Sequence, residues 1–434
     1  MLLTPLGGCQ ERGRNCFLIT WDTCKFLLDC GVSPSFEKQN PRAFPHLERV
    51  RMDELNAVIV SHAHEDHVGM LPRLYEMGYT GEVYVTKPTE QLVKDACKRW
   101  LSALDDASVP KPYPETSIEA IRPIGIDDDE TTSIAPDADF FFSASGHMLG
   151  SAMVNVRLGR RTFLYTSDYY YGSHLLPDPQ HNLSADVMLC DAFYGNFQYP
   201  KITEREEFFR TIHSCIERRG KVLLPLPLLG RSQEVVAMIL EKLDSFQNVR
   251  IFIENELKEA WMMCMNTKSW LRQETLDKPN SDCFKRLSEL TTLENTKDRL
   301  QAIESEGPAI ILGYDTPELN LLYAQRMSYD MRNLLLFSGY QAPGSVSRIL
   351  QSDSSTILAN EQKKKRLAEV KHIELRTHPD VLDTLRFIRS LKEKPELVLT
   401  FHGEGSRCLE MATVVEREFG IQSRAPMNLE EIPF

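Results

Sequence analysis

The strongest constraint on this chain is a short stretch that places several metal-binding side chains close together. Residues 61–69 read Ser-His-Ala-His-Glu-Asp-His-Val-Gly and follow 57–60, an apolar run (Ala-Val-Ile-Val) that predicts a buried strand. Alternate residues of an extended segment point the same way, so His62 and His64 can converge on one cation. Asp66 and His67 come after the chain turns, so they face the other side, where a second cation could bind. Imidazole and carboxylate ligands suit Zn²⁺, and also Mn²⁺ or Fe²⁺.

The composition is that of a globular protein with room for two or three domains, because 42% of its 434 residues are hydrophobic and 26% are charged. We expect a cytoplasmic protein without a membrane partner, since no run approaches the roughly 20 apolar residues of a membrane helix and no secretory signal opens the chain. Ten cysteines without a Cys-x-x-Cys pair argue against a zinc ribbon or a disulfide framework. The net charge of −12 weighs against a nucleic-acid partner, although bound cations and a local basic groove would offset it.

Further acidic and histidine side chains end apolar runs along the chain. His147 follows the run that starts at 139, and Asp168 follows an expected hairpin over 151–166. Three more residues stand at the ends of later strand-like runs: Asp191, His378 and His402. One such residue alone would be a weak signal. Each is a candidate ligand or catalytic group, and the resemblance described next is what implies that they share a site.

These motifs resemble a known family. His-x-His-x-Asp-His at 62–67 resembles the signature of the metallo-β-lactamase superfamily. Gly-Arg-Ser-Gln-Glu at 230–234 resembles an element of its β-CASP nucleases, the branch with ribonuclease J, the cleavage and polyadenylation endonuclease subunit, and Artemis. The resemblance covers nearly the whole chain. It has departures, because Phe193 stands where threonine is more familiar, and 313–318 (Gly-Tyr-Asp-Thr-Pro-Glu) replaces a Ser-Gly-Met turn.

The resemblance implies the fold. We expect an α/β protein with the four-layer αββα metallo-β-lactamase fold and an inserted α/β β-CASP domain. Residues 1–202 and 372–434 would form the metallo-β-lactamase domain, and 203–371 the β-CASP domain. The stretch 105–137, which is rich in proline and acidic residues, is expected to be a surface excursion.

The resemblance also implies the roles of the site residues. The first metal ion would be held by His62, His64 and His147, and the second by Asp66, His67 and His402, with Asp168 bridging them. Asp29 would support the histidine loop by accepting a hydrogen bond from a ligand imidazole. The catalytic set would be Asp66, Asp168, Asp191 and His378, of which His378 acts as general acid, oriented by Asp191. The expected substrate contacts are Arg231, Gly339, Gln341, Gly344 and Ser345. For the last four, a purely structural turn is an equally good explanation.

The expected function is hydrolysis of RNA phosphodiester bonds with two zinc ions, Mn²⁺ or Fe²⁺ being alternatives. Cleavage would be endonucleolytic, 5′-exonucleolytic or both, and would leave 5′-phosphate and 3′-hydroxyl ends. His402 favours RNA, because family members that act on RNA tend to carry histidine there and the Artemis branch carries valine. Protein partners or a homodimer are left open. The alternatives are a DNA nuclease, a small-molecule hydrolase, and a catalytically silent scaffold in an RNA-processing complex, which would be expected to have lost metal ligands.

Overall fold

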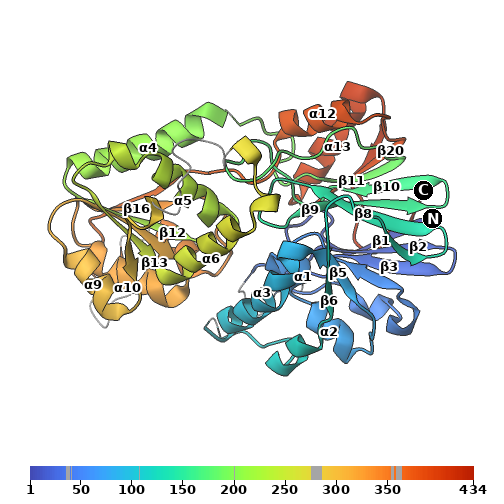
Figure 1. Ribbon diagram of the computed structural model, residues 1–434, viewed down its shortest axis with the longest axis horizontal. Coiled ribbons are helices and arrows are strands. Elements are labelled where there is room, and N and C mark those ends of the chain that lie inside the picture. The colour runs from blue at the N-terminus through green and yellow to red at the C-terminus, as the bar shows by residue number, and fades with distance from the viewer. Residues whose placement is uncertain are drawn as a thin grey trace. The chain divides into compact units, whose positions relative to one another are not determined.

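The computed structural model describes residues 1–35, 40, 42–106, 108–199, 201–274, 286–352, 356–357 and 364–434. The chain forms two compact units (Figure 1). The first unit consists of Met1–Tyr199 and Thr377–Phe434, and the second of Pro200–Arg376. Within the described ranges, no helix is both long and apolar enough to cross a membrane.

The first unit contains two mixed sheets of seven strands each. The first sheet has, in spatial order, β22 (Ile432–Pro433), β1 (Leu2–Gly7), β2 (Cys16–Trp21), β3 (Cys24–Leu28), β4 (Ala57–Ile59), β5 (Val83–Thr86) and β6 (Pro123–Ile126). The second has β21 (Gln422–Arg424), β20 (Leu397–Phe401), β11 (Val187–Asp191), β10 (Arg161–Tyr165), β9 (Ala152–Leu158), β8 (Ala138–Ala144) and β7 (Thr132–Ala135). The first and last segments of the chain therefore contribute strands to both sheets.

Apolar side chains on the facing sides of the two sheets form the core of this unit. Phe17 and Phe26 from the first sheet share one buried cluster with Phe140 and Phe163 from the second. A second cluster joins the outer face of the second sheet to α12 (Val381–Ser390) and α13 (Ser406–Phe419). The helices α1 (Glu65–Val68), α2 (Leu71–Glu76) and α3 (Lys87–Asp106) lie on the opposite side of the unit, next to the first sheet (Figure 1). This order of layers confirms the expected αββα fold.

The expectation for 105–137 as a surface excursion is wrong in part. This stretch contains β6, which pairs with β5 in parallel, and β7, which pairs with β8 antiparallel. Both are the outermost strands of their sheets. Pro123 is tolerated in β6 because an edge strand has no partner that needs its missing N–H.

The second unit is built on a six-stranded sheet whose pairs are all parallel. Its strands, in spatial order, are β14 (Thr291–Leu293), β13 (Arg250–Glu254), β15 (Ala309–Tyr314), β12 (Lys221–Leu226), β16 (Leu334–Phe337) and β19 (Glu369–His372). The central strands are apolar along most of their length, as expected for a parallel sheet covered on both faces. A small hairpin pairs β17 (Thr356–Ile357) with β18 (Lys364–Lys365).

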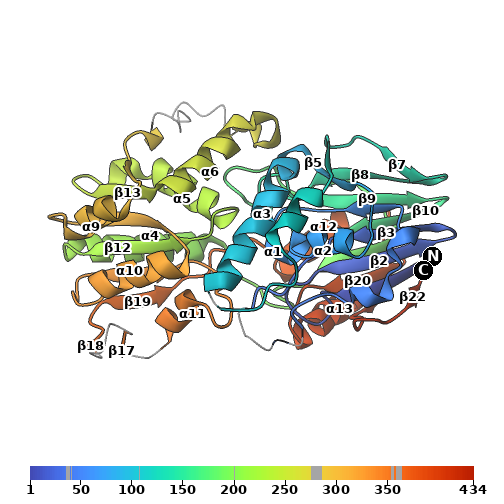
Figure 2. The same cartoon turned by 90° about the horizontal axis from the view of Figure 1, so that it is seen from below.

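Helices cover this sheet. One buried cluster joins it to α9 (Thr296–Glu304), α10 (Pro317–Met327) and α11 (Val346–Gln351). The other helices of this unit are α4 (Lys201–Glu217), α5 (Arg231–Glu241) and α6 (Asn255–Asn266). Figure 2 shows α5 and α6 on the side of the sheet opposite α10. The described 3₁₀ helices of the chain are η1 (Leu47–Arg49), η2 (Met52–Glu54), η3 (Glu115–Ala120), η4 (Leu243–Ser245) and η5 (Lys268–Trp270).

Candidate metal centre

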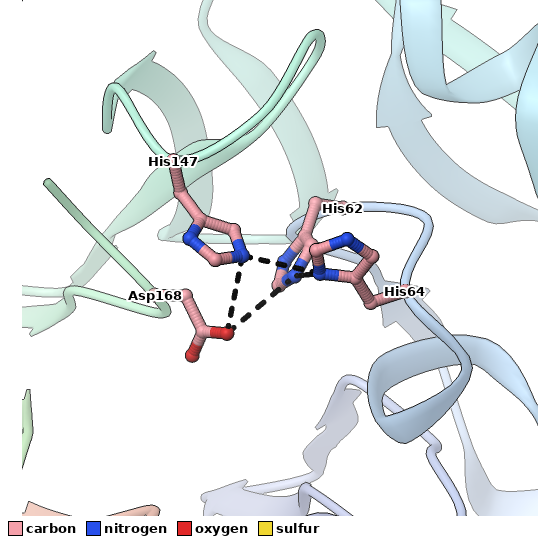
Figure 3. Close-up of side chains that lie close together, drawn as sticks. All are labelled: His62, His64, His147 and Asp168. Atoms are coloured by element: carbon pink, nitrogen blue, oxygen red, sulfur yellow. Dashed lines mark hydrogen bonds and ion pairs between the residues drawn. The ribbon is translucent and has the colours of Figure 1, made fainter. Parts of the chain in front are cut away.

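The metal-binding side chains of the first unit lie just beyond the ends of strands from both sheets. The loop after β4 carries His62 and His64, and the turn after β8 carries His147. Asp168 follows β10, and His402 follows β20. Figure 3 shows His62, His64, His147 and Asp168 pointing toward one another from these separate loops. The two packed sheets thus bring together ligands that are far apart in the sequence.

The first group of donors has the spacing of a tetrahedral metal site. His62 Nε2 lies 3.2 Å and His147 Nε2 lies 3.1 Å from His64 Nδ1. The same two Nε2 atoms lie 3.6 and 3.5 Å from Asp168 Oδ2. Metal–ligand bonds of 2.0–2.1 Å place tetrahedral ligand atoms about 3.3 Å apart. These four donor atoms all lie within 4.8 Å of one another, which is close enough for them to share one divalent cation.

A second group of donors meets the first at the same carboxylate oxygen. Asp66 Oδ2 lies 3.7 Å from His67 Nε2 and 3.7 Å from His402 Nε2. Asp168 Oδ2 is 3.4 Å from His67 Nε2 and 3.8 Å from His402 Nε2. One oxygen of Asp168 thus faces both groups, which is the arrangement required of a bridging ligand.

Asp168 also provides the test of whether a cation fits. Its side chain is buried, and its Oδ1 has no hydrogen-bond partner among the described residues. Burial alone would raise its pKa, but His402, His67 and His378 hold the pKa of this carboxyl well below its usual range. A buried carboxylate needs a compensating charge or a metal ion. The site therefore fits divalent cations.

Burial disfavours the charged form of three other ligands. It raises the pKa of Asp66 to about 7, and it lowers the pKa of His402 to about 4 although Asp168 acts in the opposite direction. Burial also lowers the pKa of the His62 imidazole well below its usual range. A neutral imidazole is the form that binds metal ions. The protein environment thus prepares His62 and His402 as ligands.

Asp29 lies behind the histidine loop and supports it through several hydrogen bonds. Its Oδ2 accepts hydrogen bonds from His67 Nδ1 at 2.7 Å and from the Tyr165 hydroxyl at 2.7 Å. Its Oδ1 accepts the backbone N–H of Ser61 at 2.7 Å. The bond to Nδ1 leaves Nε2 of His67 facing Asp66 and Asp168. His147 is oriented in the same way, because its Nδ1 donates to the carbonyl of Thr377 at 2.7 Å.

Asp29→Asn is expected to weaken metal binding by about 10- to 100-fold, because the amide is a poorer acceptor for His67 Nδ1–H. Metal affinity measured by competition with a chromogenic chelator tests this. Asp22→Asn is the matched control, since Asp22 lies in the same sheet region, is exposed and shares a left-handed backbone (φ 51° against 58° for Asp29). Equal metal affinities of the two variants would contradict the supporting role.

His378 and Asp191 form a buried pair next to the metal ligands. His378 Nδ1 lies 2.9 Å from Asp191 Oδ2 and 3.9 Å from Asp168 Oδ2, so Asp191 is its principal partner. The other oxygen of Asp191 accepts the backbone N–H of Phe193 at 2.8 Å. Burial, with the charge of Asp168, raises the pKa of Asp191 well above its usual range. The pair can therefore hold a proton between Nδ1 and Oδ2.

Sequence reasoning missed several polar residues that contact the ligands. The Asn15 amide nitrogen lies 3.0 Å from His67 Nε2 and 3.1 Å from His402 Nδ1. The Ser61 hydroxyl donates to Asp29 at 2.8 Å and receives a hydrogen bond from Ser167 at 2.6 Å. Asn15 follows a glycine-rich loop, which was its only signal in the sequence.

The expected substrate-contact residues all lie in the second unit, where they make structural contacts. Arg231 Nε donates to the carbonyl of Leu375 at 3.1 Å, and its guanidinium lies against Gly339, where a Cβ would come within 2.0 Å of it. Ser345 caps α11 by accepting the backbone N–H of Arg348 at 3.1 Å. Gln341 is buried, and Gly344 has a φ of 81°. None of them belongs to the donor groups found among the described residues.

The fold and the site define a metal-dependent hydrolase of the metallo-β-lactamase class. Residues 10–199 match the model of the metallo-beta-lactamase superfamily, and residues 364–426 match that of the Zn-dependent metallo-hydrolase RNA specificity domain. A crystal structure of a protein of unknown function from Enterococcus faecalis V583 shares the fold, with a TM-score of 0.61, 12% identity and coverage of 99% of both chains.

Curated relatives narrow the class to a family. The transcription termination factor FttA of Methanocaldococcus jannaschii is 31% identical, over 98% of this chain and 70% of its own length. The FttA proteins of Methanothermobacter thermautotrophicus and Lokiarchaeum sp. are 30% and 28% identical, each over 99% of this chain and 71% of their own length. The chain belongs to the β-CASP nuclease family of the metallo-β-lactamase superfamily.

Proposed function

We propose that this chain is a ribonuclease that hydrolyses RNA phosphodiester bonds with two metal ions. The observation that carries the proposal is the single oxygen of Asp168 that faces both donor groups. The choice of RNA is supported by the match of 364–426 to an RNA specificity domain and by the similarity to transcription termination factors. In this proposal 203–371 is the β-CASP domain.

The ligand assignment follows from the two donor groups. One ion would be held by His62, His64, His147 and Asp168, and the other by Asp66, His67, His402 and Asp168. Nitrogen-rich sites of this kind suit Zn²⁺. When bound, two such cations lower the pKa of a water molecule and stabilise the negative charge that develops on the phosphoryl oxygens.

The protein side chains complete the reaction by moving a proton. His378, held through Nδ1 by Asp191, would donate a proton from Nε2 to the leaving 3′ oxygen. Departure of that oxygen leaves a 3′-hydroxyl on one product and a 5′-phosphate on the other. Because Asp191 is also fixed by the Phe193 N–H, the imidazole keeps one orientation during the transfer.

The test is cleavage of matched end-labelled single-stranded RNA and DNA by wild type and by His64→Ala, with the metal content of both proteins determined. We expect wild type to bind about two metal ions and to cleave RNA. His64→Ala should bind fewer metal ions and cleave RNA more slowly. His46→Ala is the matched control, because His46 is partly exposed and its partner is Glu48, which is not one of the metal-binding residues. Intact RNA in the presence of a filled site would contradict the proposal, and cleavage of DNA alone would replace it with a DNA nuclease.

A further inference from the structure

The side chain of Asn15 is buried among the ligands of the second donor group. Its amide nitrogen Nδ2 lies 3.0 Å from His67 Nε2, 3.1 Å from His402 Nδ1 and 3.4 Å from Asp66 Oδ2. Its amide oxygen Oδ1 lies 3.2 Å from the same His402 Nδ1. One amide therefore reaches every ligand that the second group does not share with the first.

The main chain holds this amide and the imidazole of His402 in place. The backbone N–H of Asn15 donates to the carbonyl of Asp66 at 2.9 Å, and the carbonyl of Asn15 accepts the N–H of Gly31 at 2.9 Å. On the other side, the backbone N–H of His402 donates to the carbonyl of Gly8 at 2.7 Å. The two side chains therefore meet in a geometry that both backbones fix.

The nitrogen Nδ1 of His402 determines whether its Nε2 can bind a metal ion. Nε2 faces the donor group, 3.7 Å from Asp66 Oδ2 and 3.8 Å from Asp168 Oδ2. A neutral imidazole that offers the lone pair of Nε2 carries its hydrogen on Nδ1. Because His402 is buried, this N–H needs an acceptor, and Asn15 Oδ1 is the oxygen that lies within hydrogen-bonding distance of it.

We propose that Asn15 is a positioning residue for the second metal ion, which holds His402 in the tautomer that offers Nε2 to the ion. The proposal rests on the proposed function, because it uses the ligand assignment made there. Asn15 would do for His402 what Asp29 does for His67, with an amide oxygen in place of a carboxylate. With Oδ1 accepting from His402, Nδ2 donates to Asp66 Oδ2, so one amide orients two ligands.

The test compares Zn²⁺-loaded wild type, Asn15→Leu and Asn15→Asp by competition with a chromogenic chelator. Leucine keeps the branched shape of asparagine without its hydrogen-bonding atoms. We expect Asn15→Leu to bind the second ion about 10- to 100-fold more weakly than wild type. It should bind the first ion within about threefold of wild type, because the amide contacts only ligands of the second group. Asn15→Asp should recover most of the affinity, because its carboxylate accepts the Nδ1–H.

Two double variants identify the ion that is affected. Asn15→Leu should cost no further affinity when His402→Ala is already present, because both changes act on one ion. Added to His64→Ala, it should leave neither ion tightly bound. Asn155→Leu is the matched control, since it removes another buried amide of the same unit, one that donates to Ser143 Oγ at 2.8 Å. This control should retain both ions.

The outcomes separate the positioning role from the proposed function. Equal affinities of wild type and Asn15→Leu for the second ion would overturn the role, even if wild type cleaves RNA. Tighter binding by Asn15→Leu would also overturn it, because the amide would then compete with the ion for His67 Nε2.

The aspartate variant distinguishes the hydrogen bond from packing. If Asn15→Asp unfolds at the wild-type temperature but binds the second ion as weakly as Asn15→Leu, acceptance from His402 is not what matters and the role is wrong. A loss of the second ion in Asn15→Leu, together with no RNA cleavage by wild type, would contradict the ribonuclease proposal and keep the positioning role. If wild type binds fewer than two Zn²⁺ ions, both are wrong.

Discussion

Asp168→Asn is expected to lower RNA cleavage by about 10³-fold, which corresponds to about 4 kcal/mol of lost transition-state stabilisation. The substitution removes a negative charge from the atom that both donor groups share, 3.4–3.8 Å from the Nε2 atoms of four histidines. We expect the protein to retain fewer than two metal ions, since the shared ligand is lost. Single-turnover cleavage of end-labelled RNA and elemental analysis of the purified protein measure the two effects.

The control for this variant is Asp53→Asn, which neutralises an exposed carboxylate that pairs with Arg51. It should keep the metal content and activity of wild type. Thermal unfolding of Asp168→Asn shows whether a loss of activity reflects loss of the fold. A folded Asp168→Asn protein with two bound ions and undiminished turnover would refute the bridging role.

The part of the site that could be predicted from local pattern is the loop after β4. His62, His64, Asp66 and His67 lie within six residues, so local geometry alone indicates that His62 and His64 converge on one cation and that Asp66 and His67 face the other side. The other ligands could be assigned only through the family resemblance. A single histidine such as His147 at a strand end has the same local pattern as an ordinary polar side chain.

The rest of the site depends on contacts between distant parts of the chain. Asn15 and His402 are 387 residues apart in sequence and lie within hydrogen-bonding distance because β2 and β20 belong to two packed sheets. No periodicity or spacing encodes such a contact. The edge strand β6 was missed for a related reason, since its proline and acidic neighbours have loop-like composition and only pairing with β5 makes it a strand.

Phe193 shows that a departure from a family pattern can be informative. As a sequence feature it only weakened the resemblance. In the structure the imidazole of His378 stacks on its ring, and the guanidinium carbon of Arg12 lies 4.2 Å from the ring centre. The substitution therefore changes how the proposed general acid is held, since a threonine could not stack on the imidazole.

His378→Ala is expected to lower RNA cleavage by about 10²- to 10⁴-fold while the protein keeps its metal ions. The imidazole is the proposed proton donor to the leaving 3′ oxygen, and its principal partner is Asp191 at 2.9 Å, not a metal ligand. Loss of the ring therefore removes proton transfer and leaves both donor groups complete. Single-turnover rates and metal content, measured on the same preparation, distinguish this variant from Asp168→Asn.

The leaving group provides the sharper test of the role of His378. Nitrophenolate leaves a phosphodiester without being protonated. His378→Ala should therefore hydrolyse a nitrophenyl phosphodiester within about tenfold of the wild-type rate, whereas Asp168→Asn should lose activity on both RNA and the nitrophenyl ester. If His378→Ala lost the same fraction of its activity on RNA and on the nitrophenyl ester, His378 would not be the general acid. A loss of metal ions in His378→Ala would instead show that His378 is a metal ligand. Its Nδ1 lies 3.9 Å from Asp168 Oδ2, which is close enough for the two atoms to bind one ion.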